Sequence, residues 1–191
     1  MGHIHNNIGE HDQTVSAFIV RTDLGDEPRL MLHMHKKLGK LLQVGGHIEL
    51  NENPWQAIHH ELLEESGYDL NQLQILQPKQ FRIKTLDYVT VHPIPIVQST
   101  HGFEIWPGHY HTDTTYAFVA NSDPNNEPVD GESQDIRWVT YKELCAVPEN
   151  EIIDNIREIG KLVLTVFLKE WEQVPSDEFP VVNVKPKWSL G

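Results

Sequence analysis

The segment 45–68 constrains the fold more than any other part of the chain, because it predicts a glycine turn followed by a well-delimited helix. We expect the helix over 54–66. Asn53 suits the N-cap, Pro54 suits the first helical position, and Gly67 suits the residue after the last turn. The turn, the helix and its ends together indicate a strand–loop–helix unit inside a mixed α/β domain.

The predicted helix has an apolar face and an acidic face. At 3.6 residues per turn, Trp55, Ile58 and Leu62 fall together and would face a core. An adjacent arc carries three carboxylates, those of Glu61, Glu64 and Glu65. Carboxylates at these spacings repel one another, and two of them lie late in the helix, where the macrodipole disfavours negative charge. Either the face is simply solvated, or a hard divalent cation such as Mg²⁺ or Mn²⁺ neutralises it.

The whole segment resembles the box of the NUDIX (MutT-like) hydrolase family, G-x5-E-x7-R-E-U-x-E-E-x-G-U, where U is a bulky apolar residue. Eight positions agree in register, namely Gly46, Glu52, Glu61, Leu62, Glu64, Glu65, Gly67 and Tyr68. His60 stands where the box has arginine. The domain would cover 13–172, between a flexible N-terminal arm over 1–12 and a proline-containing tail over 173–191.

The resemblance implies an α/β fold, an α/β/α sandwich around a mixed β-sheet. It also implies hydrolysis of a diphosphate linkage in a nucleoside diphosphate joined to another group, with Mg²⁺ or Mn²⁺ as cofactor. The implied metal ligands are Glu61, Glu64, Glu65 and the carbonyl of Gly45. The implied catalytic residues are these three glutamates and Glu132. One glutamate would take the proton of the attacking water, with Glu61 as first choice and Glu132 as second. Gly46 would let the chain turn tightly and Glu52 would brace the loop against the helix.

His60 opens an alternative. Arginine is a permanent cation with a planar fork, whereas histidine reaches less far and is mostly neutral at pH 7. A relative that binds nucleotide and metal but turns substrate over weakly is therefore a second hypothesis. Because every carboxylate of the box is present, we favour an active enzyme.

The twelve histidines suggest further contacts. His109, His111 and Asp113 alternate along a predicted strand, so they could share a face that binds a transition metal or substrate phosphate. Histidines lining a surface without any ligand are the alternative, and the similar pair His33 and His35 has the same two interpretations. Candidate substrate contacts are His47, His60, Tyr110 and His111, and candidates for stacking on a base are Tyr88, Trp106 and Tyr110.

The remaining secondary structure is predicted as strands and two further helices. Strands are expected over 14–22, 29–35, 41–44, 73–84, 89–97, 114–120 and 135–140. The strand 41–44 should stop at the glycine pair, and 98–108 should be a loop. A short helix should begin at 141, and the longest helix should cover 151–171.

Composition excludes several classes of protein. The chain has 191 residues with 15 Lys and Arg against 28 Asp and Glu, a formal charge of −13, which disfavours nucleic-acid polymers and anionic membranes as partners. The single cysteine, Cys145, excludes a disulfide framework. The isopentenyl diphosphate isomerases, which share the fold of the family that the box resembles, carry a catalytic cysteine near the strand before the box, whereas Cys145 lies late in the chain, so an isomerase is not expected. No apolar secretory stretch is visible near residue 1, so a cytoplasmic setting is expected. The long helix and the two arms are compatible with a homodimer.

Overall fold

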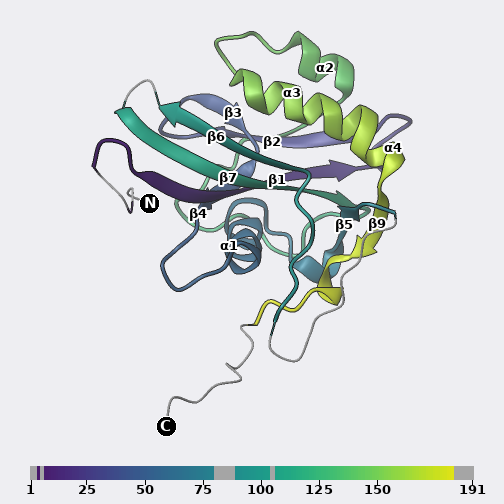
Figure 1. Ribbon diagram of the computed structural model, residues 1–191. Coiled ribbons are helices and arrows are strands. Elements are labelled where there is room, and N and C mark those ends of the chain that lie inside the picture. Colours follow the sequence, from purple (N-terminus) through teal and green to yellow (C-terminus); the bar gives the residue numbers. More distant parts are fainter. Residues whose placement is uncertain (1–3, 5–6, 80–88, 104–105, 183–191) are drawn as a thin grey trace.

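A parallel pair of long strands lies at the centre of the sheet in the computed structural model, which describes residues 4, 7–79, 89–103 and 106–182 (Figure 1). The pair consists of β1 (His11–Arg21) and β7 (Trp106–Ala120), which align residue for residue from His11 opposite Tyr110 to Arg21 opposite Ala120. Seven further strands in the described ranges join this pair in one mixed sheet.

Antiparallel strands extend the sheet beyond β1. The glycine-containing strand β4 (Val44–His47) pairs with the first half of β1, and β2 (Arg29–His35) pairs with its end. On the same side as β1, the end of β2 pairs with β3 (Lys40–Leu42), and the opposite side of β2 pairs with β8 (Ile136–Val139). The first two predicted strands therefore pair as an antiparallel hairpin, with the turn over 22–28.

Three more strands lie beyond β7. Two of them pair with it directly, β6 (Val97–Phe103) along its length and β5 (Leu73–Gln77) at its end. The last strand, β9 (Glu172–Pro175), pairs with β5. Because β9 and the nearby Phe179 pack on the domain, the folded part of the chain extends beyond the boundary predicted at 172.

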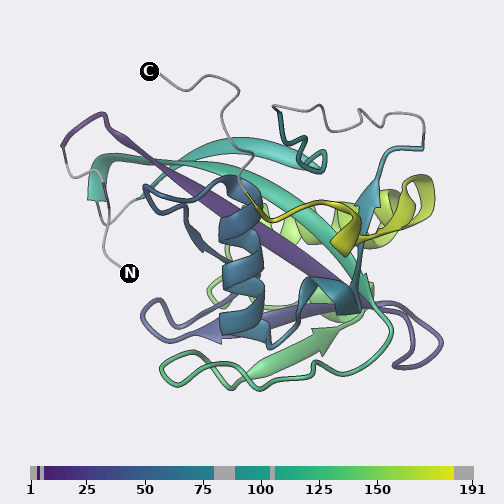
Figure 2. The ribbon, with the colours of Figure 1, turned by 90° about the horizontal axis from the view of Figure 1, so that it is seen from below.

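Helices cover both faces of the sheet, as the resemblance implied. α1 (Pro54–Glu61) and its continuation η1 (Leu62–Ser66) cross one face, in front of β1 in Figure 2. The other face is covered by α2 (Tyr141–Ala146) and by the continuous helical run α3 (Asp154–Leu162), η3 (Val163–Phe167) and α4 (Leu168–Glu170). Two short 3₁₀ turns, η2 (Leu70–Gln72) and η4 (Ser176–Glu178), complete the described helical elements.

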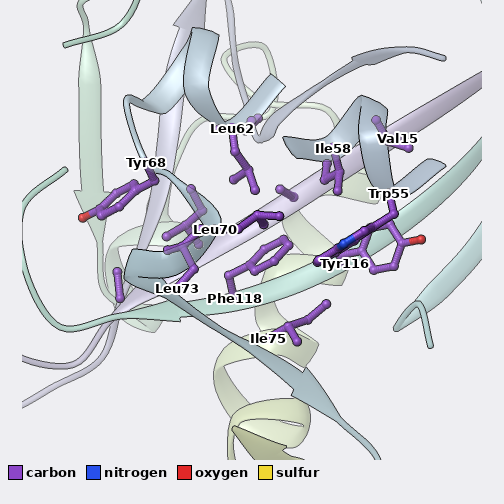
Figure 3. Close-up of a cluster of buried hydrophobic side chains, with 14 of the residues drawn as sticks. Val15, Trp55, Ile58, Leu62, Tyr68, Leu70, Leu73, Ile75, Tyr116 and Phe118 are labelled. Carbon is purple, nitrogen blue, oxygen red and sulfur yellow. The ribbon is translucent and has the colours of Figure 1, made fainter. Parts of the chain in front are cut away.

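Alternation along the central strands divides the buried side chains into two cores. Odd-numbered residues of β1 and even-numbered residues of β7 pack under α1, where Trp55, Ile58 and Leu62 are fully buried as predicted. Figure 3 shows this core, with Trp55 between Tyr116 and Phe118. The opposite face packs against α2 and α3 through side chains such as Phe18, Val119 and Ile156.

The predicted helix over 54–66 is present, but its last turn is not α-helical. Asn53 forms a capping box, accepting hydrogen bonds from the backbone N–H groups of Trp55 and Gln56. Over Leu62–Ser66 the chain winds as a π-helix, and Gly67 ends it with φ of 73°. Single π-turns within helices occur often at functional sites. Here the π-turn carries Glu64 and Glu65.

Four predicted elements differ from the structure. The strand 41–44 does not stop at the glycines, because β4 runs through both and pairs with β1. The predicted loop 98–108 falls largely within β6 and β7, whereas 90–96, predicted as strand, is irregular. Pro93 and Pro95 explain the latter, since proline cannot donate a hydrogen bond to a sheet. The expected strand 73–84 is seen as β5 to Gln77, and its residues 80–84 lie outside the described ranges.

The structure also describes the two ends of the chain in part. β1 begins at His11, so the sheet includes the last residues of the predicted arm. Within the described ranges, no helix combines the length and the apolar character that crossing a bilayer requires.

Candidate active site

The site is built where β4 passes beneath the end of α1. A Cβ on Gly46 would overlap the carboxylate of Glu61 and lie 2.6 Å from its Cδ atom. A Cβ on Gly45 would instead overlap the backbone carbonyl of Val15 on β1. The glycine pair therefore serves two close approaches, one to a glutamate and one to the central strand.

Two of the three helix glutamates are buried here. Glu61 is 5% exposed and Glu65 is 7% exposed, while the Glu64 side chain is more open at 34%. The backbone N–H of Gly45 donates a hydrogen bond of 2.8 Å to Glu65 Oε2. The structure thus brings together Gly45, Gly46, Glu61 and Glu65, which the sequence separates by up to 20 residues.

Burial makes both carboxylates hard to ionise. Desolvation raises the pKa of Glu61 to about 7, with the charge of His60 opposing the shift and those of Glu64 and Glu132 adding to it. Desolvation likewise raises the pKa of Glu65 to about 8, although its hydrogen bond from Gly45 works in the other direction. Buried carboxylates of this kind become stable as anions when a cation lies between them. Their oxygen donors are those that Mg²⁺ and Mn²⁺ prefer.

Glu132 reaches the same region from a separate part of the chain. It lies half-buried in the loop before β8, where its backbone N–H donates to the Val129 carbonyl at 3.0 Å. Its charge acts on both Glu61 and Glu65, raising the pKa of each. Four acidic side chains therefore share one electrostatic environment.

His60 lies between two glutamates of the box. Its Nε2 atom is 2.8 Å from Glu64 Oε1, and its Nδ1 atom is 3.4 Å from Glu52 Oε1. Desolvation lowers the pKa of His60, but the hydrogen bond to Glu64 and the surrounding carboxylate charges outweigh it and raise the pKa overall. His60 thus bridges Glu52 and Glu64, and its raised pKa favours the charged imidazole. It therefore contacts both glutamates from the position at which the box has arginine.

The other box residues fix the loop and the helix end. Glu52 accepts a hydrogen bond from the backbone N–H of Glu49 at 3.4 Å, which closes the loop before the helix. The carbonyl of Gly67 accepts a hydrogen bond from the Asn126 backbone N–H at 3.3 Å, and a Cβ at Gly67 would overlap the Asn126 carbonyl. Gly67 is therefore required both by its left-handed backbone and by the neighbouring loop.

His33 is a contact that the sequence did not assign. From β2 its Nε2 atom lies 3.6 Å from Glu65 Oε2 and 3.1 Å from the Gln43 carbonyl, and the side chain is 2% exposed. Burial lowers its pKa, and so favours the neutral ring. The alternation of 29–35 placed His33 on a strand face, but only the pairing of β2 with its neighbours brings it to the helix.

The remaining predicted contacts divide between the two faces of β7. His111 is buried beside His47, with ring centroids 4.9 Å apart, on the face away from α1. Tyr110 lies on the α1 side of the strand, 37% exposed and stacked on His11 at 5.0 Å. Tyr88 and the side chain of Trp106 lie outside the described part of the structure.

Asp113 is not the carboxylate that lies beside His109, although the spacing of His109, His111 and Asp113 suggested a shared site. Its carboxylate accepts hydrogen bonds from the hydroxyls of Thr14, Ser16 and Thr115 at 2.8, 3.0 and 2.6 Å. The carboxylate beside His109 is that of Asp12, contributed by the parallel strand β1 at 3.2 Å. Sequence spacing within one strand could not reveal this partner, because it comes from the other strand of the central pair.

Comparison with known proteins gives one family. The family model described as NUDIX domain matches residues 11–159. A NUDIX-family hydrolase from Clostridium perfringens is 28% identical, with a TM-score of 0.61 over 81% of this chain and 97% of that one. No match was found among curated proteins.

Two further solved structures share the fold at lower identity. The NUDIX domain of NrtR from Shewanella oneidensis, solved with ADP ribose, is 12% identical, with a TM-score of 0.55 over 81% of this chain and 86% of that one. The dihydroneopterin triphosphate pyrophosphohydrolase of E. coli is 15% identical, with a TM-score of 0.55 over 83% of this chain and 98% of that one.

Proposed function

The chain belongs to the NUDIX family and is a hydrolase of phosphorus-containing acid anhydrides, and we propose that it cleaves the diphosphate linkage of a nucleotide-type substrate with Mg²⁺ or Mn²⁺. The observation that carries the proposal is the buried pair Glu61 and Glu65 beside the glycines of β4. An acidic site of this kind repels a diphosphate until cations reverse its local charge.

The residues present fit such a cation. Glu61, Glu64 and Glu65 would hold it together with the carbonyl of Gly45, an all-oxygen donor set suited to a hard ion. Gly46 keeps free the space that the Glu61 carboxylate occupies. When bound, the cation neutralises phosphate charge and makes the attacking water more acidic.

The protein's own residues then position the groups and accept the proton. We assign the proton-accepting role to a carboxylate oxygen of Glu61 first and of Glu132 second, since both lie in the shared acidic environment. His60 holds Glu64 from one side and Glu52 from the other, which fixes the helix relative to the loop. Its two ring nitrogens are engaged by these glutamates, so we treat His60 as a positioning residue and not as a substrate contact.

Binding without efficient turnover is the second candidate function, and the replacement of the box arginine by His60 favours it. The NrtR domain bound to ADP ribose shows that a related fold holds such a ligand. The bridge from His60 to Glu52 and Glu64 supports catalysis instead, because the neighbouring carboxylates raise the pKa of the imidazole and so favour the form that carries positive charge, as the box arginine does. We therefore place hydrolysis first.

Turnover of a nucleotide panel tests the proposal. The panel contains ADP-ribose, NADH, nucleoside triphosphates, their oxidised forms and dinucleoside polyphosphates, each with Mg²⁺, with Mn²⁺ and with excess chelator. A coupled phosphatase reports cleavage that releases no free phosphate. We expect chelator-sensitive turnover of at least one compound. Binding of a nucleotide by calorimetry, with no turnover of any compound, would establish the second candidate.

A matched pair of variants locates the chemistry. Glu64→Gln removes one charged ligand and keeps the shape, so turnover should fall by about 10² or more. Glu149→Gln removes an exposed carboxylate far along the chain and should leave turnover unchanged. Equal activity of the two variants would refute the assignment of the helix glutamates to the metal.

A further inference from the structure

A second group of polar side chains is buried on the sheet face away from α1. Parallel register places Asp12 beside His111 and Thr14 beside Asp113, so alternate residues of β1 and β7 face the same side. This set is buried throughout, at 9% exposure or less, and consists of Asp12, Thr14, Ser16, His109, His111, Asp113 and Thr115. Burying so many polar groups costs free energy unless each finds a partner. We therefore expect these side chains to contact one another or a ligand.

Three of these side chains converge as metal ligands do. One donor atom from each of Asp12, His109 and His111 lies within 4.8 Å of the other two, and the exposed fractions are 0, 2 and 7%. We propose that these three residues bind a divalent transition-metal ion of the zinc type, and that His47, which lies beside Asp12, completes the site. The site uses none of the box glutamates, so it stands independently of the proposed hydrolase function.

Two of the ligand-to-ligand distances can be compared with those of a tetrahedral site. His109 Nε2 and His47 Nε2 lie 3.2 and 3.3 Å from Asp12 Oδ2. Zinc–nitrogen and zinc–oxygen bonds of about 2.0–2.1 Å place neighbouring ligand atoms about 3.3 Å apart in a tetrahedron. A charge-assisted hydrogen bond would be shorter, about 2.7–2.9 Å. The two observed separations both lie close to that tetrahedral edge length.

His47 joins the other ligands from a third strand. It lies directly opposite Thr14 in the β4–β1 pair, and residues opposite one another in antiparallel strands point to the same face. Its ring is 4.9 Å from that of His111, which itself lies 5.4 Å from the ring of His109. Three imidazoles from two strands thus surround the single carboxylate of Asp12.

Surrounding side chains support the same ligand set. The three hydroxyl groups that donate to Asp113 fix its carboxylate, which adds negative charge without competing for the ion. The ring of His101 lies 5.4 Å from that of His111 and restricts its orientation. Imidazole-rich donors select zinc-type ions, whereas the oxygen donors of Glu61, Glu64 and Glu65 select magnesium.

Metal retention by the full chain, expressed without an affinity tag, is the test. The protein is stripped with chelator, mixed with zinc in the presence of excess Mg²⁺, passed through gel filtration and analysed for metal. We expect about one zinc per chain to be retained. Binding of inorganic phosphate in place of zinc, or no retention of zinc, would overturn the proposal.

Variants then assign the site. Asp12→Asn, and separately His109→Ala with His111→Ala, should weaken zinc binding at least 100-fold. The control carries His3→Ala with His5→Ala, because that pair near residue 1 could bind zinc without any fold, and it should retain the ion. Retention by the Asp12 and His109/His111 variants, or loss in the control alone, would refute the site.

Two further measurements keep the test valid if the site variants fail to fold. Wild-type protein loaded with cobalt should show the strong visible absorption of a tetrahedral nitrogen–oxygen site, and an octahedral spectrum would contradict the geometry. Glu64→Gln should keep the same cobalt spectrum, because the second site shares no ligand with the helix. Loss of the spectrum in Glu64→Gln would show that the ion was bound at the helix glutamates.

Discussion

Substitution of Gly46 by alanine should slow catalysis about 100-fold while leaving the protein folded. The added Cβ would lie 2.6 Å from the Cδ atom of Glu61, whereas ordinary contact begins at 3.4 Å, so the carboxylate must retreat by about 0.8 Å. Metal ligands tolerate deviations of about 0.2 Å. A displacement near 1 Å at a reacting centre costs about 100-fold in rate, which corresponds to about 2.7 kcal/mol.

The effect on stability should be much smaller, because the obstacle is the end of a flexible side chain. A changed rotamer costs about 0.5–1.5 kcal/mol, which lowers the Tm of a chain of this size by only a few degrees. Gly45→Ala provides the contrast. Its Cβ would meet the Val15 carbonyl and lie 3.1 Å from the Ser16 Cα atom, so β4 would have to separate from β1. That variant should lose stability first.

Steady-state turnover at saturating Mg²⁺ and thermal unfolding distinguish the two effects. Gly102→Ala is the matched control, since its Cβ would lie 3.5 Å from the Tyr110 ring, in ordinary contact. We expect kcat to fall about 100-fold in Gly46→Ala and to be unchanged in Gly102→Ala. A folded Gly46→Ala protein with wild-type kcat would refute the argument that Gly46 keeps Glu61 in place as a ligand.

Three further predictions follow from contacts in the same domain. His60→Arg should match or exceed wild-type kcat while His60→Ala lowers it, and a collapse of rate in His60→Arg would give the imidazole a role of its own. Trp55→Ala should destabilise the protein by about 3–5 kcal/mol in chemical denaturation, because the indole is fully buried and donates to the Phe179 carbonyl at 3.0 Å. Mg²⁺ at about 100 times its Kd should stabilise the fold by about 2.7 kcal/mol, and a Tm that does not respond to Mg²⁺ would argue against a metal site at the helix.

The helix that carries the box glutamates was the part most readable from sequence. Its cap, its length and the burial of Trp55 follow from local rules that need no knowledge of the rest of the chain. The π-turn at Leu62–Ser66 could not be predicted, because it depends on packing against β4 and on the loop at Asn126. Local propensity is overridden by such tertiary contacts.

Sequence spacing predicted contacts least well where two strands that are distant in sequence contribute residues to one site. Along β7, alternation correctly placed His109 and His111 on one face, but it offered Asp113 as their carboxylate. The parallel register of β1 with β7 supplies Asp12 instead. A single sequence contains no local signal for that register, since the two strands are brought together only by the hydrophobic residues farther along them.

The parallel pairing of β1 with β7 also determines when the protein can fold during its synthesis. The hydrogen bond from Thr14 to Asp113 spans 99 residues, and closing a loop of that length costs about 4 kcal/mol in chain entropy. The ribosome completes the entire box, through Tyr68, before it adds the first residue of β7. A nascent chain stalled before Trp106 therefore carries every glutamate of the box without β7, whose Tyr116 and Phe118 pack against Trp55 of α1. The group of Asp12, His109 and His111 is assembled only by this late, long-range contact.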